Sequence, residues 1–149
     1  MKHLIISAIC LAFIYSCSSM KIESVDFSWP VESILDIDAN GVIKDQRFSI
    51  IINTKVLFDE ERKDNPNIQP KQIHIIRNKN GFYFITADGF KNVYVFKSGM
   101  GSLELEKKIL ISEVGMNKPA FNQRSPNVEL LDGNNAPKNL THEGILGGK

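Results

Sequence analysis

Three oxygen-bearing side chains at alternating positions form the best-spaced group of potential ligands in this 149-residue chain. Asp36, Asp38 and Asn40 precede Gly41 in the stretch DIDANGVIKDQR. Carboxylate and amide oxygens spaced in this way around a tight turn are ligands that Ca²⁺ prefers. The same residue types also occur in ordinary turns, where Asp and Asn side chains accept hydrogen bonds from nearby backbone N–H groups. The spacing therefore fits either a calcium-binding turn or a plain turn.

The stretch resembles the calcium-binding loop of the EF-hand family at its first three ligand positions and at its glycine. In that family the last loop position is a Glu that binds the ion with both oxygens, whereas Arg47 stands at that position here. Lys44 adds a second positive charge, and the flanking residues alternate as strands do. We therefore predict a plain turn, with no metal or other cofactor, and keep Ca²⁺ binding as the alternative.

Cys17 is the second residue with a distinct chemistry, because it follows an apolar segment at the N-terminus. Residues 4–15 are almost entirely apolar and come after the basic residues Lys2 and His3. About a dozen apolar residues is fewer than the roughly 20 that a membrane-spanning helix needs, so the segment has the form of a secretory signal peptide. Cys10 lies inside this segment, and the chain has no third cysteine.

The residues Ile14-Tyr15-Ser16-Cys17 resemble the lipobox of bacterial lipoproteins. The resemblance covers residues 1–19 and implies that residues 1–16 are removed and that Cys17 carries acyl chains such as palmitate. It implies a protein of the bacterial cell envelope, anchored to a lipid bilayer on the periplasmic side or at the cell surface. Cleavage after Ser18 without lipidation is the alternative. Lipidation would also account for a cysteine that has no partner after export.

Residues suited to other kinds of chemistry are scarce. Once residues 1–16 are removed, the remaining histidines are His74 and His142. The chain has no G-x-S-x-G motif, no H-E-x-x-H motif and no glycine-rich phosphate loop. Without Lys2 the 18 basic residues become 17, against 17 acidic residues, so the exported chain has no general attraction for nucleic acid. We predict that the protein is not an enzyme and does not bind nucleic acid.

Alternation of apolar and polar residues predicts strands near residues 31–37, over residues 48–58 and near residues 103–111. In the last of these strands, Leu105 and Ile109 are expected to share one face. Glycine-containing turns are predicted at Gly41, at Asn80-Gly81 and at Asp88-Gly89. Residues 25–114 should therefore form a mainly β domain. We expect a small antiparallel sandwich or partly open barrel of about six to eight strands.

Tyr83 and Tyr94 are the candidate binding residues of this domain. A two-residue loop at Asp88-Gly89 would place Tyr83 directly opposite Tyr94 on paired strands. The two rings would then form either a binding platform or, as is more common, ordinary cross-strand packing.

Three segments lack the strand pattern. Residues 17–24 would form a short tether between Cys17 and the domain. Residues 59–72 are polar and contain two prolines, which predicts a long loop. From residue 115 Asn, Pro and Gly become frequent, which predicts an irregular tail over residues 115–149.

Three hypotheses for function follow from these features. The preferred one is a membrane-anchored envelope lipoprotein that acts as a non-catalytic scaffold or docking module for a protein partner in a larger assembly. The alternatives are a ligand- or Ca²⁺-binding β module at the membrane surface and an envelope enzyme of unidentified class. An exposed apolar surface favours docking, whereas a deep pocket with converging polar groups favours ligand binding or catalysis.

Overall fold

The computed structural model describes residues 26–147, which form antiparallel sheets of five, four and two strands. The predicted mainly β, antiparallel fold is confirmed, and none of the sheets within these residues closes into a barrel. The five-stranded sheet has the order β1-β4-β5-β6-β7. Its strands are β1 (Ser33–Asp36), β4 (Gln72–Arg77), β5 (Tyr83–Thr86), β6 (Asn92–Ser98) and β7 (Leu103–Leu110).

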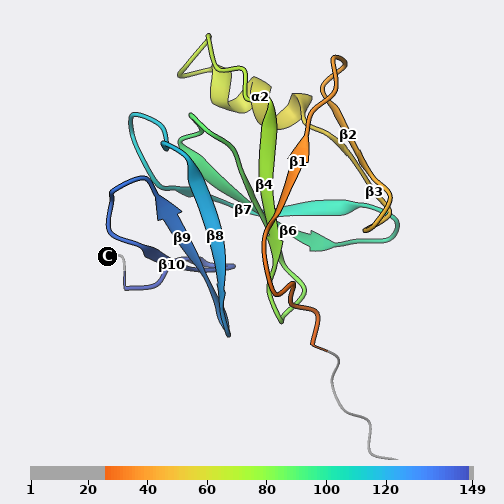
Figure 1. Ribbon diagram of the computed structural model, residues 1–149, viewed down its shortest axis with the longest axis vertical. Coiled ribbons are helices and arrows are strands. Elements are labelled where there is room, and N and C mark those ends of the chain that lie inside the picture. The colour runs from red at the N-terminus through yellow and green to blue at the C-terminus, as the bar shows by residue number, and fades with distance from the viewer. Residues whose placement is uncertain (1–25, 148–149) are drawn as a thin grey trace, which may run out of the picture.

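The other two sheets lie on opposite sides of β4 (Figure 1). The four-stranded sheet, in the order β11-β10-β9-β8, contains β8 (Pro119–Arg124), β9 (Asn127–Asp132), β10 (Lys138–Thr141) and β11 (Gly144–Ile145). The two-stranded sheet is a hairpin of β2 (Val42–Asp45) and β3 (Ile50–Asn53), and it leads into helix α2 (Lys55–Arg62). Among residues 26–147, no helix has the length and apolar character that a membrane crossing requires.

The five-stranded sheet is buried on both of its faces. Directly opposed residues in antiparallel strands point to the same side, so Phe84 and Val95 share one face while Ile85 and Tyr94 share the other. All four side chains are at most 2% exposed. The face of Phe84 packs on the four-stranded sheet, which β4 and β7 contact through β8 and β11. The face of Ile85 is directed toward the β2–β3 hairpin and α2.

The prediction of an irregular tail over residues 115–149 is wrong, because residues 119–145 form the four-stranded sheet. In β9 the buried residues alternate with half-buried ones, so that Val128, Leu130 and Asp132 point inward. Pro126 lies in the turn between β8 and β9, and Gly133 lies between β9 and β10. The Pro, Asn and Gly content therefore marks tight turns. Strands β1–β7 agree with the six to eight expected for residues 25–114, and the C-terminal sheet brings the described residues to eleven strands.

The predicted strand over residues 48–58 is also wrong in its second half, where α2 begins at Lys55. Asn53 Oδ1 accepts a hydrogen bond from the backbone N–H of Lys55. The Thr54 hydroxyl donates to the carbonyl of Gly41 over 2.7 Å. These bonds turn the chain out of the strand, and Leu57 and Glu61 then point inward from successive helical turns. Over five residues, apolar alternation does not distinguish a strand from a helical turn.

Two further details of register differ from the predictions. Tyr83 is paired with Phe96, and Tyr94 with Ile85, because residues 87–91 connect β5 to β6. A bulge at Glu106 in β7 places Leu105 and Ile109 on opposite faces of the sheet. The three predicted glycine turns are present, with positive φ at residues 41, 81 and 89.

Leu130 tests whether the C-terminal sheet is an integral part of the core. Its side chain is 1% exposed, so we expect Leu130→Ala to lower the free energy of unfolding by about 2–5 kcal/mol. Leu146 is 57% exposed, and Leu146→Ala should change that free energy by less than about 0.5 kcal/mol. Urea unfolding followed by the fluorescence of Trp29, the single tryptophan, measures both. Equal, small effects would contradict an integral C-terminal sheet.

Candidate functional site: an open apolar groove

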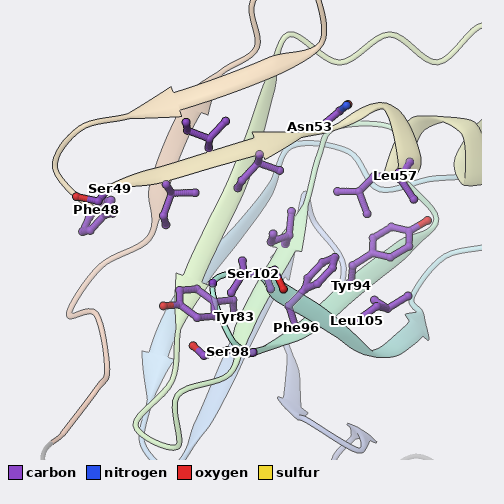
Figure 2. Close-up of a pocket in the computed structure, with 18 of the residues that line it drawn as sticks. Phe48, Ser49, Asn53, Leu57, Tyr83, Tyr94, Phe96, Ser98, Ser102 and Leu105 are labelled. Carbon is purple, nitrogen blue, oxygen red and sulfur yellow. The ribbon is translucent and has the colours of Figure 1, made fainter.

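An open groove of about 1100 Å³ lies between the β2–β3 hairpin and the Ile85 face of the five-stranded sheet. Figure 2 shows Phe48 and Ser49 at one end of the groove and Leu57 and Tyr94 at the other. Strands β5, β6 and β7 form the floor, and β3 with the start of α2 forms the opposite wall. Most of the lining is apolar, including Ile50, Ile52, Tyr83, Tyr94, Phe96 and Leu105.

Aromatic contacts fix the hairpin at the first end of the groove. The ring of Phe48 stacks on Trp29 with centroids 4.1 Å apart, and Trp29 meets Tyr83 edge to face at 5.7 Å. Asp45 holds the hairpin tip, because its Oδ1 accepts hydrogen bonds from the backbone N–H groups of Arg47 and Phe48. The hairpin, the segment before β1 and the sheet are thereby joined at one aromatic cluster.

A buried carboxylate fixes the second end. Glu61 on α2 is 2% exposed and accepts three hydrogen bonds of 2.8 Å each. The donors are the backbone N–H of Lys91, the side-chain amide of Asn92 and the hydroxyl of Tyr94. Burial, together with the neighbouring Glu61 carboxylate, raises the pKa of Tyr94, so the phenol stays protonated and donates. The Tyr94 hydroxyl is thus held by α2, and its ring lines the groove.

The charged residues that line the groove neutralise each other. Within residues 26–147, the charged lining residues are Glu60 on α2 and Lys108 on β7. Lys108 Nζ lies 2.6 Å from Glu60 Oε1, and Lys63 contacts the other oxygen of the same carboxylate. The hydrogen bonds from Lys108 and Lys63 lower the pKa of Glu60 to about 2. An ionic ligand would therefore meet a cation that is already paired.

Both predicted binding residues line this groove, although they do not face each other. Tyr83 lies opposite Phe96, and Tyr94 lies two residues before Phe96 on β6. The rings of Tyr83, Tyr94 and Phe96 lie on the same face of the sheet, because opposed residues and residues two apart on a strand point to the same side. Tyr83 is 9% exposed and Tyr94 is 2% exposed, so these tyrosines form a packed floor rather than a projecting pair.

Two of the three predicted metal ligands, Asp36 and Asp38, accept hydrogen bonds from other groups of the chain, and the backbone N–H of the third, Asn40, donates to Asp38. Asp38 Oδ1 accepts bonds from the backbone N–H groups of Asn40 and Val42, at 2.9 and 2.8 Å. Asp36 Oδ1 accepts a bond of 2.8 Å from the side-chain amide of Gln72. Across residues 26–147, no group of three or more His, Cys, Asp or Glu side chains is arranged to hold a metal ion.

The remaining candidates for chemistry lie away from the groove. His74 Nδ1 is 3.1 Å from Glu32 Oε2, which also accepts the backbone N–H of Phe121 on β8 over 2.8 Å. His142 stacks on Phe82 with centroids 4.4 Å apart. Both histidines therefore have packing or bridging contacts. Cys17 lies outside the described residues, so its lipidation stays a prediction.

Sequence analysis did not identify Phe48, Glu61 or Leu105 as parts of a site. Glu61 belongs to the polar run DEERKD, and within that run only its place on α2, one turn after Leu57, distinguishes it from its neighbours. A helical interpretation of residues 55–62 would have placed Glu61 on the buried side. Leu105 faces the groove because of the bulge at Glu106, for which the sequence gives no clear signal.

Comparison with known proteins gives no relative: no family model matches the chain, and no curated protein or solved structure is significantly similar to it. The use of the groove must therefore be argued from its own geometry.

Glu61→Gln tests the buried hydrogen-bond network. The new amide group would place an N–H donor among three donors, so at least one of them loses its acceptor. We expect the free energy of unfolding to fall by about 1–3 kcal/mol, measured by urea unfolding at pH 7. Glu143→Gln is the control, because the Glu143 side chain is 83% exposed and its replacement should have an effect below about 0.5 kcal/mol. If the two variants were equally stable, the network would not hold α2 on the sheet.

Proposed function

We propose that this chain is a bacterial envelope lipoprotein, anchored through an acylated Cys17, that acts as a non-catalytic docking module. In this proposal the groove between the β2–β3 hairpin and the sheet receives an apolar segment of a protein partner in the envelope. The observation that carries the proposal is an open groove of about 1100 Å³ whose lining is mostly apolar. An open groove with a mostly apolar lining and a polar border fits a site for an apolar segment.

The exposure of individual lining residues supports docking. Val56 and Leu105 line the groove and are 74% and 56% exposed, respectively. Single exposed aliphatic residues are normal on a protein surface, but these two border one continuous groove. Covering them would remove apolar surface from water at about 25 cal/mol per Å². A partner with an apolar segment therefore gains affinity from the groove itself.

The polar groups of the groove give little support to catalysis. The hydroxyl of Tyr94 donates to Glu61, and Glu60 is paired with Lys108. A catalytic site needs groups that converge on one reacting atom, whereas these four side chains are directed at each other. This is the reason for preferring a docking module over an envelope enzyme.

The anchor would hold the groove close to a membrane. Cys17 precedes Asp26, the first described residue, by nine positions, and an extended chain spans at most about 3.6 Å per residue, or about 30 Å in all. The exported chain has equal numbers of acidic and basic residues, so anionic lipids would add little attraction. Attachment would therefore depend on the acyl chains, at ~0.8 kcal/mol for each buried methylene.

The anchor is tested at Cys17. We expect mass spectrometry of the mature protein to find an N-terminus at residue 17 that carries lipid. Cys17→Ala should abolish this modification and block signal-peptide removal, because no other residue supplies the thiol at that position. Cys10→Ala, within the segment that is discarded, should leave both unchanged. An unmodified N-terminus at Ser19 would show ordinary secretion and contradict the anchored function.

Docking is tested by photo-crosslinking in living cells, with a benzophenone amino acid placed at residue 105 or at residue 110. Both leucines lie on β7 and are similarly exposed, at 56% and 50%, but only Leu105 lines the groove. We expect one defined envelope protein to be crosslinked from position 105, and Ile50→Glu in the groove wall to remove that product. Equal crosslinking from the two positions, or none from position 105, would contradict docking in the groove.

A further inference from the structure

The groove has the shape and chemistry to hold one linear acyl chain. Its accessible floor includes Phe96, Leu103 and Leu105, and its wall includes Ile50 and Ile52. Its volume of about 1100 Å³ is slightly above the range found for small-molecule sites, ~300–1,000 Å³. Each methylene that leaves water for such a surface contributes ~0.8 kcal/mol. A long unbranched chain therefore gains free energy by entering it.

The charges of the groove favour a lipid that is itself uncharged. Lys108, the cation that lines the described part of the groove, is paired with Glu60 at 2.6 Å. A fatty acid or an anionic phospholipid would bring a net negative charge to a groove whose lining cation is already paired, which costs free energy when the anion is desolvated. A diacylglyceryl group in thioether linkage to a cysteine carries no charge. The lipid proposed for Cys17 therefore fits this groove better than either anionic lipid.

The chain that leads toward Cys17 also starts beside the groove. Trp29 stacks on Phe48 and contacts Tyr83, and both of these residues line the groove. The floor from Tyr94 to Ser98 on β6 is about 13 Å long at 3.3 Å per residue. The nine residues before Asp26 reach about 30 Å. A lipid on Cys17 is therefore tethered within reach of the whole groove of its own molecule.

We propose that one acyl chain of Cys17 occupies the groove of the same molecule when the protein is in water, and that insertion of the lipid into a bilayer empties the groove. The inference rests on the proposed function, because it adds regulation to the same docking site: the partner can bind only after the lipid has left. The acyl chain should prefer the bilayer to the groove because the bilayer buries it more completely. The groove is open to solvent, so it covers one chain incompletely, whereas a bilayer covers every chain fully.

The test uses the exported chain, residues 17–149, which keeps every described residue and has Cys17 as its sole cysteine. Cys17 is alkylated with a maleimide that carries a brominated hexadecyl chain, or with N-ethylmaleimide as the control. Bromine quenches tryptophan fluorescence at short range, and Trp29 is the single tryptophan. We expect loss of Trp29 fluorescence in the hexadecyl adduct, which should remain a monomer in gel filtration. Neutral phosphatidylcholine vesicles should restore the fluorescence.

Matched variants assign the effect to the groove. Leu105→Glu places a charge on the groove floor and should abolish the quenching, whereas Leu110→Glu on the same strand should preserve it. Circular dichroism and thermal unfolding of both variants verify that the fold is retained. Quenching that survives Leu105→Glu would place the chain elsewhere and overturn the inference.

Two further outcomes would also overturn it. Absence of quenching in the hexadecyl adduct would show that the tethered chain stays outside the groove. The docking function is tested separately, by crosslinking from residue 105 in cells. Free brominated hexadecanol, which is uncharged like the tethered chain, is added to the N-ethylmaleimide adduct at a concentration equal to that of the protein. Because tethering raises the effective concentration of the chain to about the millimolar range, the free chain should quench far less. Equal quenching would indicate a site for external lipid.

Discussion

The groove depends on one buried interaction, the acceptance of three hydrogen bonds by the carboxylate of Glu61. Removing a carboxylate from water costs several kcal/mol unless donors replace the lost hydration, and here Lys91, Asn92 and Tyr94 supply them from β6 and the turn before it. Helix α2 is thereby attached to β6 of the five-stranded sheet. Since α2 follows β3 directly, the same bonds hold the hairpin over the sheet. The hydroxyl of Tyr94 donates its hydrogen bond to Glu61 on α2, and the ring of Tyr94 forms part of the groove floor.

A second fixed point makes the groove an open space rather than a closed core. At the other end, Phe48 stacks on Trp29, so the hairpin is held at its tip as well as at its base. Between these points the groove stays open and Leu105 is 56% exposed, although Ile50 and Ile52 of β3 pack against the core. A fold selected for stability alone would close such a gap, because each apolar Å² left in water forgoes about 25 cal/mol. Retention of the gap is the kind of local cost that functional surfaces carry.

Much of the β architecture follows from features visible in the sequence, whereas the groove follows from features that are not. Turn glycines at residues 41, 81 and 89 adopt the positive φ that their neighbours would resist, and alternation identifies most of the five-stranded sheet. Composition predicts an irregular tail because it does not distinguish irregular chain from strands joined by tight turns, such as the turns at Pro126 and Gly133. Tyr83 and Tyr94 share a face as predicted, but their register depends on the length of the 87–91 connection. Glu61 and the bulge at Glu106 act through tertiary contacts that no local pattern encodes.

The proposed anchor at Cys17 would connect the groove with the membrane. A module on a tether of about 30 Å would sample a thin layer above the bilayer, where the local concentration of any other envelope-bound protein is far higher than in bulk water. Weak apolar contact in an open groove would then be enough for docking, without a deep, high-affinity pocket. The same short tether would keep the proposed lipid within reach of the groove, and the bilayer would be the competing apolar phase that empties it. Because Glu60 and Lys108 are paired, their charges would not oppose this exchange. Docking strength would thus be set by membrane attachment as much as by the contacts of the groove.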